Sequence, residues 1–109
     1  MGVYRLKRTT NNQFYFTLHA GNGEVILTSE RYATKQGAQN GIESVKVNSP
    51  HDDRYVRKTS QDNKPMFNLT AVNGQVIGTS ETYSSTQARE AGIASVKSSG
   101  PGSPTIDQT

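Results

Sequence analysis

Apolar and polar residues alternate along several short stretches of the chain, and this period of two predicts β-strands. The clearest stretch covers residues 14–20, where one side of the strand carries Phe14, Phe16, Leu18 and Ala20. The same pattern predicts strands over residues 3–8, 24–29, 55–58, 67–71 and 75–79. Pattern alone therefore predicts six strands in two groups of three.

After each group of strands the apolar period lengthens to that of a helix. Ala38, Ile42 and Val45 recur at spacings of four and three, which predicts a helix over residues 34–47. Ile93 and Val96 mark a second helix over residues 85–97. Ser84 and Gln87 have the spacing of a capping box at its start. Gly41 and Gly92 take the same position in the two helices, and we infer that this position lets each helix lie close to the sheet.

One stretch of the chain occurs twice. Residues 20–32 read AGNGEVILTSERY, and residues 71–83, 51 positions later, read AVNGQVIGTSETY. Residues 4–50 and 55–101 share 21 of 47 positions without a gap. A match of this extent indicates a duplicated structural unit, but two copies are too few for a solenoid. We therefore expect one compact domain with pseudo-twofold symmetry.

Each copy contains an Asn-Gly pair between two strand-like runs, which is the strongest local signal for a β-hairpin. A two-residue type I′ turn at Asn22-Gly23 and at Asn73-Gly74 would pair Ala20 with Val25 and Leu18 with Leu27. That register places Val25 on the core face, and it places Ile26 and Ile77 on the opposite face. A longer loop would shift the register by one residue and reverse these assignments.

The predicted fold is an α+β domain. Two tandem β-β-β-α(-β) repeats form one mainly antiparallel sheet, with both helices on one face. Repeat one covers residues 3–50, repeat two covers 54–101, and the single domain covers 1–109. In the tail, residues 102–109, Ile106 falls one repeat period after Tyr55, so the tail is either a further edge strand or a frayed terminus. We expect a monomer that contains an internal pseudo-dimer.

The tandem pattern A-x-N-G-x-V-I-x-T-S-E-x-Y, followed by a helix that ends G-I-x-S-V-K, resembles the YegP-like family of small bacterial proteins. The resemblance covers nearly the whole chain. It implies a single sheet in which the last strand of each repeat joins the other half. The family is an uncharacterised one, so the resemblance implies a fold and no biochemical activity.

Composition narrows the possible functions. The chain has no Cys, which excludes disulfides and thiolate metal sites, and we expect neither a metal nor a cofactor. No secretion signal or membrane span is evident, so we expect a cytoplasmic protein with no membrane partner. The net charge of +3 is mild and argues only weakly for a polyanionic partner.

No residue set has the pattern of a catalytic site. His19 and His51 have no nucleophile near them in sequence, and the recurring Ser29-Glu30 and Ser80-Glu81 pairs lack a base. We interpret these serines as structural, with hydroxyls that bond the backbone where a strand ends. The sequence therefore predicts a protein that is not an enzyme.

The leading functional hypothesis is a non-enzymatic binding or structural module whose protein partner is unknown. Its contact surface would be the sheet face away from the helices, with Tyr15, His19, Ile26, Met66, Thr70 and Ile77. The alternative is weak nucleic-acid binding by basic strands that carry Arg5, Lys7, Arg8, Arg54, Arg57 and Lys58, with Tyr4 and Tyr15 as stacking residues. Charges on edge strands also serve to prevent unwanted strand pairing.

Overall fold

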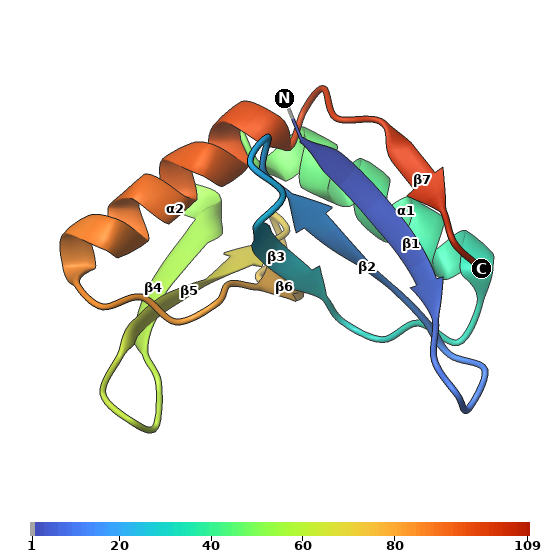
Figure 1. The fold of residues 1–109 in the computed structure, drawn as a ribbon, viewed down its shortest axis with the longest axis horizontal. Coiled ribbons are helices and arrows are strands. Elements are labelled where there is room, and N and C mark those ends of the chain that lie inside the picture. The colour runs from blue at the N-terminus through green and yellow to red at the C-terminus, as the bar shows by residue number, and fades with distance from the viewer. Residues whose placement is uncertain (1) are drawn as a thin grey trace.

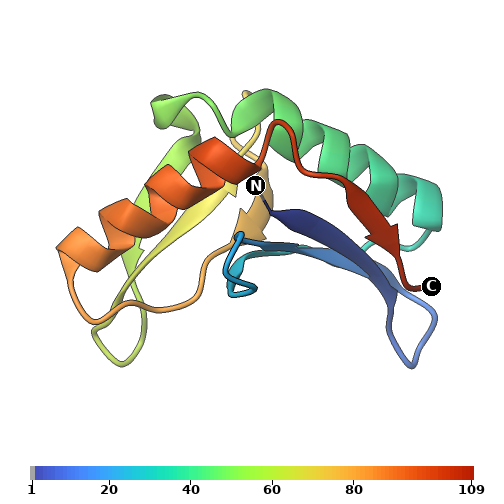
Figure 2. The ribbon, with the colours of Figure 1, turned by 45° about the horizontal axis from the view of Figure 1, so that its top comes forward.

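The computed structural model describes residues 2–109 and shows one seven-stranded sheet with both helices on the same face (Figure 1, Figure 2). The strand order is β4-β5-β6-β3-β2-β1-β7, and every neighbouring pair is antiparallel except β1 with β7. This confirms the predicted α+β class; residue 1 of the predicted domain lies outside the described residues. The elements are β1 (Val3–Arg8), β2 (Phe14–His19), β3 (Val25–Ser29), α1 (Lys35–Asn48), the short 3-10 helix η1 (Asp52–Arg54), β4 (Tyr55–Thr59), β5 (Pro65–Thr70), β6 (Val76–Thr79), α2 (Thr86–Ser99) and β7 (Thr105–Asp107).

The two repeats meet at the centre of the sheet, between β3 and β6. Thr28 pairs there with Thr79, which is the same position one repeat later, so the pseudo-twofold axis passes between these two residues. Helix α1 contacts β5 and β6 across this seam, and α2 contacts β2 and β3. The sheet and both helices are therefore shared between the repeats.

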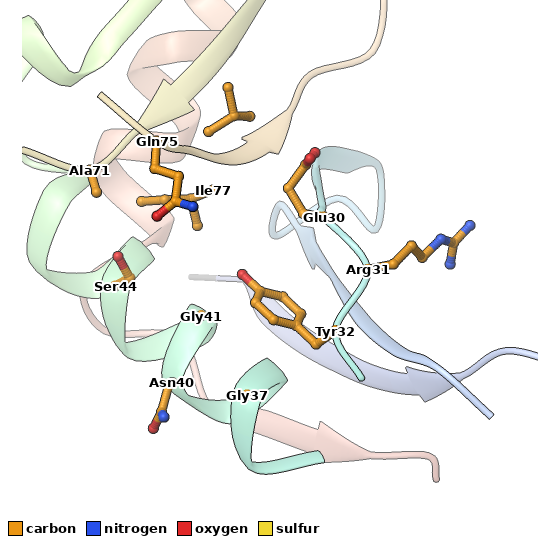
Figure 3. A pocket seen from close by; sticks show the side chains of 11 residues that line it. Glu30, Arg31, Tyr32, Gly37, Asn40, Gly41, Ser44, Ala71, Gln75 and Ile77 are labelled. Atoms are coloured by element: carbon orange, nitrogen blue, oxygen red, sulfur yellow. The ribbon is translucent and has the colours of Figure 1, made fainter. Parts of the chain in front are cut away.

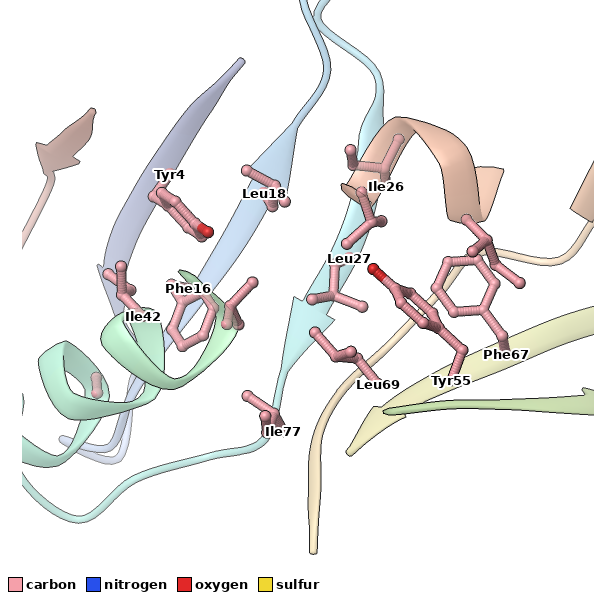
Figure 4. Close-up of a cluster of buried hydrophobic side chains, with 14 of the residues drawn as sticks. Tyr4, Phe16, Leu18, Ile26, Leu27, Ile42, Tyr55, Phe67, Leu69 and Ile77 are labelled. Atoms are coloured by element: carbon pink, nitrogen blue, oxygen red, sulfur yellow. The ribbon is translucent and has the colours of Figure 1, made fainter. Parts of the chain in front are cut away.

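One cluster of buried hydrophobic side chains fills the space between the sheet and the helices (Figure 4). Both repeats contribute to it, so neither repeat encloses a separate core. Its members are Tyr4, Leu6, Phe16, Leu18, Ile26, Leu27, Ala38, Ile42, Val45, Tyr55, Phe67, Leu69, Ile77, Ile93 and Val96.

The first strand of each repeat holds the end of the other repeat's helix. The Tyr4 hydroxyl of β1 donates a hydrogen bond of 2.6 Å to the carbonyl of Gly100, the C-cap of α2. The Tyr55 hydroxyl of β4 donates one of 2.7 Å to the carbonyl of Ser49, the C-cap of α1. Burial raises the pKa of both tyrosines, so both hydroxyls stay protonated as donors. These two bonds satisfy carbonyls that the helices themselves leave without partners.

A second pair of tyrosines explains the repeated glycines. Tyr32 stacks on Phe16, with ring centroids 6.5 Å apart, and lies over Gly41 of α1. A Cβ at Gly41 would be 2.8 Å from Cζ of Tyr32 and 2.9 Å from the Phe16 ring. Tyr83 relates to Gly92 in the same way. The glycines therefore bring each helix close to the sheet, as inferred, and they also make room for the tyrosine that precedes the helix.

The predicted type I′ turns are wrong. The Gly23 amide donates to the Ala20 carbonyl and the Ala20 amide donates to the Glu24 carbonyl, so the loop has three residues. Only Gly23 in this loop has a positive φ, at 88°, and Gly74 repeats it at 87°. A β-bulge follows the loop within β3: His19 pairs with Val25, whereas Leu18 still pairs with Leu27. The extra residue, Ile26, turns toward the core.

The start of α2 differs from the sequence-based prediction, and the structure of the tail decides between the two alternatives given for it. Ser85, rather than Ser84, caps α2, and its side chain accepts a hydrogen bond from the Ala88 amide, so the predicted capping box is wrong. The tail forms β7, which runs parallel to β1 and resolves the two alternatives in favour of a strand. β4, which follows α1, pairs with β5, and β7, which follows α2, pairs with β1. The strand after each helix therefore lies in the half of the sheet opposite to the strands that precede that helix.

Replacing Tyr4 or Tyr55 by Phe leaves a helix-end carbonyl without its buried donor. We expect each substitution to lower the free energy of unfolding by about 1–2 kcal/mol in urea denaturation. The unfolded chain releases the tyrosine protons first, near pH 10, so this stabilisation is full below pH 10 and declines as the pH rises further. Tyr15→Phe is the control, because its hydroxyl makes no hydrogen bond to residues 2–109. An equal loss in all three variants would contradict a role for the two helix-end bonds.

Gly41→Ala and Gly92→Ala introduce a Cβ into the space of Tyr32 and Tyr83. We expect each to lower the free energy of unfolding by about 1–3 kcal/mol despite the higher helix propensity of Ala. Gly37→Ala is the matched control, because the equivalent residue of repeat two is Ala88. That control is expected to be neutral or to stabilise by up to about 1 kcal/mol. Thermal and chemical denaturation measure both effects, and a stabilising Gly41→Ala would show that the tyrosine needs no glycine.

Candidate functional site

The sheet face opposite the helices carries a basic and aromatic cluster in repeat one. Residues of β1 and β2 that alternate with the buried ones point to this side, because successive side chains of a strand face opposite ways. We use the name basic-aromatic cluster for Arg5, Lys7, Tyr15, His19 and Arg31. None of the side chains that β1, β2 and β3 present on this face is acidic.

Tyr15 lies at the centre of the basic-aromatic cluster. Cζ of the Arg31 guanidinium lies 4.2 Å from the centroid of the Tyr15 ring, and Nζ of Lys7 lies 5.9 Å from it. Across the β1–β2 ladder Lys7 pairs with Tyr15 and Arg5 pairs with Thr17. Cation–π contact thus holds two positive groups against one half-buried ring.

His19 is held by two neighbours and does not face a nucleophile. Its Nδ1 lies 3.1 Å from the Gly23 carbonyl, which can only accept, so Nδ1 carries the proton. Its Nε2 lies 2.9 Å from the Thr17 hydroxyl. This arrangement orients the imidazole at the edge of the cluster and explains why Thr17 is buried on a helix-free face.

The repeated serines play the structural role that the sequence predicted. The Ser29 hydroxyl accepts from the Phe16 amide at 2.9 Å and donates to the Glu30 carbonyl at 2.8 Å. Ser80 makes the same two bonds with Phe67 and Glu81. Each hydroxyl therefore replaces a ladder bond where its strand ends.

Three of the six predicted contact residues are not available on the surface. Ile26 and Ile77 are 6% and 5% exposed and belong to the core, because the bulge turns them toward the helices. The expectation of two exposed isoleucines is therefore wrong. Thr70 is 8% exposed, and its hydroxyl donates to the Arg54 carbonyl. The remaining three, Tyr15, His19 and Met66, are half-buried on the helix-free face.

Some of the basic residues predicted to bind nucleic acid form ion pairs within the protein, and others do not. Arg57 lies on the helix side, where Glu90 and Asp52 bind it and raise its pKa. Arg54 pairs with Asp53, and the Arg8 guanidinium lies over the Phe14 ring. Tyr4 is buried and cannot stack on a ligand. Among residues 2–109, the cations of the helix-free face that have no ion-pair partner are Arg5, Lys7, Arg31 and Lys58.

Repeat two does not reproduce the cluster. The positions equivalent to Arg5, Tyr15, His19 and Arg31 hold, in the same order, Val56, Met66, Thr70 and Thr82. Lys58 alone keeps the charge of its counterpart, Lys7. Sequence reasoning missed Arg31, although a comparison of the two repeats at outward-facing positions would have shown where they differ.

Two cavities lie on the helix side of the sheet, at equivalent places in the two repeats. One, of about 440 Å³, lies between α1, the segment from Glu30 to Tyr32, and the β5–β6 hairpin (Figure 3). The other, of about 460 Å³, lies between α2, the segment from Glu81 to Tyr83, and the β2–β3 hairpin. Each cavity is therefore walled by both repeats.

No metal centre is evident in this part of the chain. Among residues 2–109, no group of three His, Asp or Glu side chains is placed to hold a metal ion. Within the same range, no helix combines the length and apolar character needed to cross a lipid bilayer.

Comparison with known proteins agrees with the duplicated architecture. Residues 10–55 and 60–107 each match a family described as a domain of unknown function, DUF1508. A UPF0339 protein of Bordetella pertussis is 58% identical over 100% of this chain and 98% of its own length. The UPF0339 protein YegP of Escherichia coli strain K12 is 50% identical over 99% and 98%, respectively.

Two solved structures share the fold. The solution NMR structure of a UPF0339 protein from Shewanella oneidensis superposes with a TM-score of 0.91 at 55% identity, covering 97% of this chain and 90% of that one. The solution NMR structure of YegP from Escherichia coli, titled a protein of unknown function, gives 0.93 at 50% identity over 99% and 93%. With two matched repeats and full-length relatives of this similarity, the chain belongs to the uncharacterised UPF0339 (YegP) family of tandem DUF1508 proteins.

Proposed function

We propose that this protein is a non-enzymatic binding module that holds single-stranded nucleic acid weakly on the helix-free face of repeat one. The observation that carries the proposal is the basic-aromatic cluster, in which Lys7 and Arg31 lie against Tyr15 and Arg5 lies two residues before Lys7 on β1. None of these three cations has an acidic partner within residues 2–109. Cations that remain free in a folded protein attract phosphates, and an aromatic ring among them offers a surface on which a base can stack.

The choice of a single strand follows from the shape and chemistry of this face. It is the broad face of a sheet, without a projecting helix that could enter the major groove of a duplex. Thr28 and Asn68 add uncharged polar side chains to the same sheet face. An acidic protein segment would use the same cations but would make no use of the ring, so we treat it as the competing outcome of the test.

Binding without catalysis is supported by how the reactive side chains are used. Both ring nitrogens of His19 have partners, and the hydroxyls of Ser29 and Ser80 are committed to backbone groups. The cations Arg5, Lys7 and Arg31 of the helix-free face, by contrast, form no ion pair within the described residues. The side chains of this face therefore favour electrostatic binding of a ligand over catalysis.

Binding to a labelled oligo-dT or oligo-U strand, followed by fluorescence anisotropy between 50 and 200 mM salt, tests the proposal. Three phosphate contacts predict a log–log salt slope of about −2. Arg5→Val and Arg31→Thr, which introduce the residues of repeat two, should each weaken binding and reduce the slope by about 0.7. Tyr15→Met should weaken binding with little change of slope, because it removes stacking and no charge.

Lys64→Gln is the matched control, because it removes one positive charge from the β4–β5 turn and introduces the residue found at Gln13 in repeat one. It should leave binding nearly unchanged. Binding that is absent at 50 mM salt, or that falls as much with Lys64→Gln as with Arg5→Val, would overturn the proposal. Preferential binding of a poly-glutamate peptide would replace the nucleic acid with an acidic protein partner.

A further inference from the structure

The cavity between the β2–β3 hairpin and α2 is independent of the helix-free face. Its volume of about 460 Å³ suits a small ligand. Ala20 and Ile26 of the hairpin form an apolar side, and Ala88 and Ala91 of α2 form the other. A ligand with an aliphatic body would bury apolar surface between these two walls.

A fixed tyrosine hydroxyl opens into this cavity. The Tyr83 ring stacks on Phe67, with centroids 6.3 Å apart, and its position over Gly92 leaves little freedom. Its hydroxyl makes no hydrogen bond to residues 2–109. Burial raises the pKa of Tyr83, and the nearby carboxylates of Glu81 and Glu24 raise it further, so the hydroxyl stays protonated and available to a ligand.

The charge of the cavity comes from carboxylates that nothing neutralises within the described residues. Six of the nine acidic side chains form ion pairs, and the three that do not are Glu24, Glu30 and Glu81. All three line the two cavities. Glu24 belongs to the hairpin wall and Glu81 to the segment before α2, so two carboxylates approach one cavity from different elements.

The equivalent cavity in the other half allows the lining residues to be compared within the same chain. There Glu30 and Tyr32 repeat Glu81 and Tyr83, but Gln75 takes the place of Glu24. Figure 3 shows Gln75 and Ile77 on one side, Tyr32 opposite them, and the Arg31 side chain directed away. The two cavities are thus alike in size, and Gln75 in place of Glu24 removes one carboxylate. They also differ in that Arg31, Gly37 and Asn40 line the cavity beside Glu30 where Thr82, Ala88 and Ala91 line the cavity beside Glu81.

We propose that the cavity walled by Glu24, Glu81 and Tyr83 binds a short aliphatic diamine. The two carboxylates would each accept charge-assisted hydrogen bonds from one ammonium group, and the methylene chain would lie between the hairpin and α2. The Tyr83 hydroxyl would accept a third bond from an ammonium. The cavity beside Glu30 lacks the second carboxylate and does not hold a diamine at the same concentration.

Isothermal titration calorimetry with 1,4-diaminobutane tests this assignment, with 1-aminobutane and 1,4-butanediol as probes of one charge and of none. We expect one diamine per chain, binding at least about tenfold weaker for the monoamine, and no binding of the diol. Glu24→Gln, which introduces the residue of the equivalent cavity, should weaken diamine binding by about tenfold or more. The reverse change, Gln75→Glu, should create a second site and raise the stoichiometry toward two.

Circular dichroism melting confirms that both variants fold, and each carries a residue that already occupies the equivalent place. Equal affinity of the wild type and Glu24→Gln, binding of the diol, or no heat at millimolar diamine would each overturn the proposal. Neither substitution lies on the helix-free face, so nucleic-acid binding and diamine binding can fail separately.

Discussion

Two reciprocal hydrogen bonds tie the ends of both helices to the opposite halves of the sheet, and the remaining structure depends on this exchange. Tyr4 of the first repeat binds the last turn of α2, and Tyr55 of the second repeat binds the last turn of α1. The two helix ends meet: a Cβ at Gly100 would be 2.7 Å from Cβ of Ser49, its equivalent. Since each half supplies the group that the other half needs, the halves are expected to fold together.

The shared core follows from the same exchange. A sheet of three strands with one helix has too little apolar surface to enclose a core of its own, whereas the joined sheet buries both apolar stripes at once. The bulge in each hairpin contributes by turning Ile26 and Ile77 inward at the seam. A local irregularity of the strand thus supplies part of the contact that unites the two repeats.

Symmetry of the fold does not extend to the surface. Positions that pack, such as Phe16 with Phe67 or Gly41 with Gly92, are kept in both repeats because they carry the same structural role twice. Outward positions are free of that constraint. Arg5, Tyr15 and Arg31 of repeat one correspond there to Val56, Met66 and Thr82 of repeat two. Within residues 2–109, four of the five cations that have no ion pair lie on the helix-free face, and the three free carboxylates line the cavities of the other face. Unpaired positive and unpaired negative side chains are therefore concentrated on different faces of the sheet.

The sequence by itself determined the elements, the duplication and the fold class, because periodicity and turn-forming residues act over a few neighbouring positions. It did not determine the turn type: Asn22-Gly23 suits both a two-residue and a three-residue loop, and backbone bonds to Ala20 and Glu24 decide between them. That single choice moved two isoleucines from the predicted surface into the core. Only the tertiary structure decided which charges remain free and where cavities open, because ion pairs such as Arg57 with Glu90 join residues far apart in the chain.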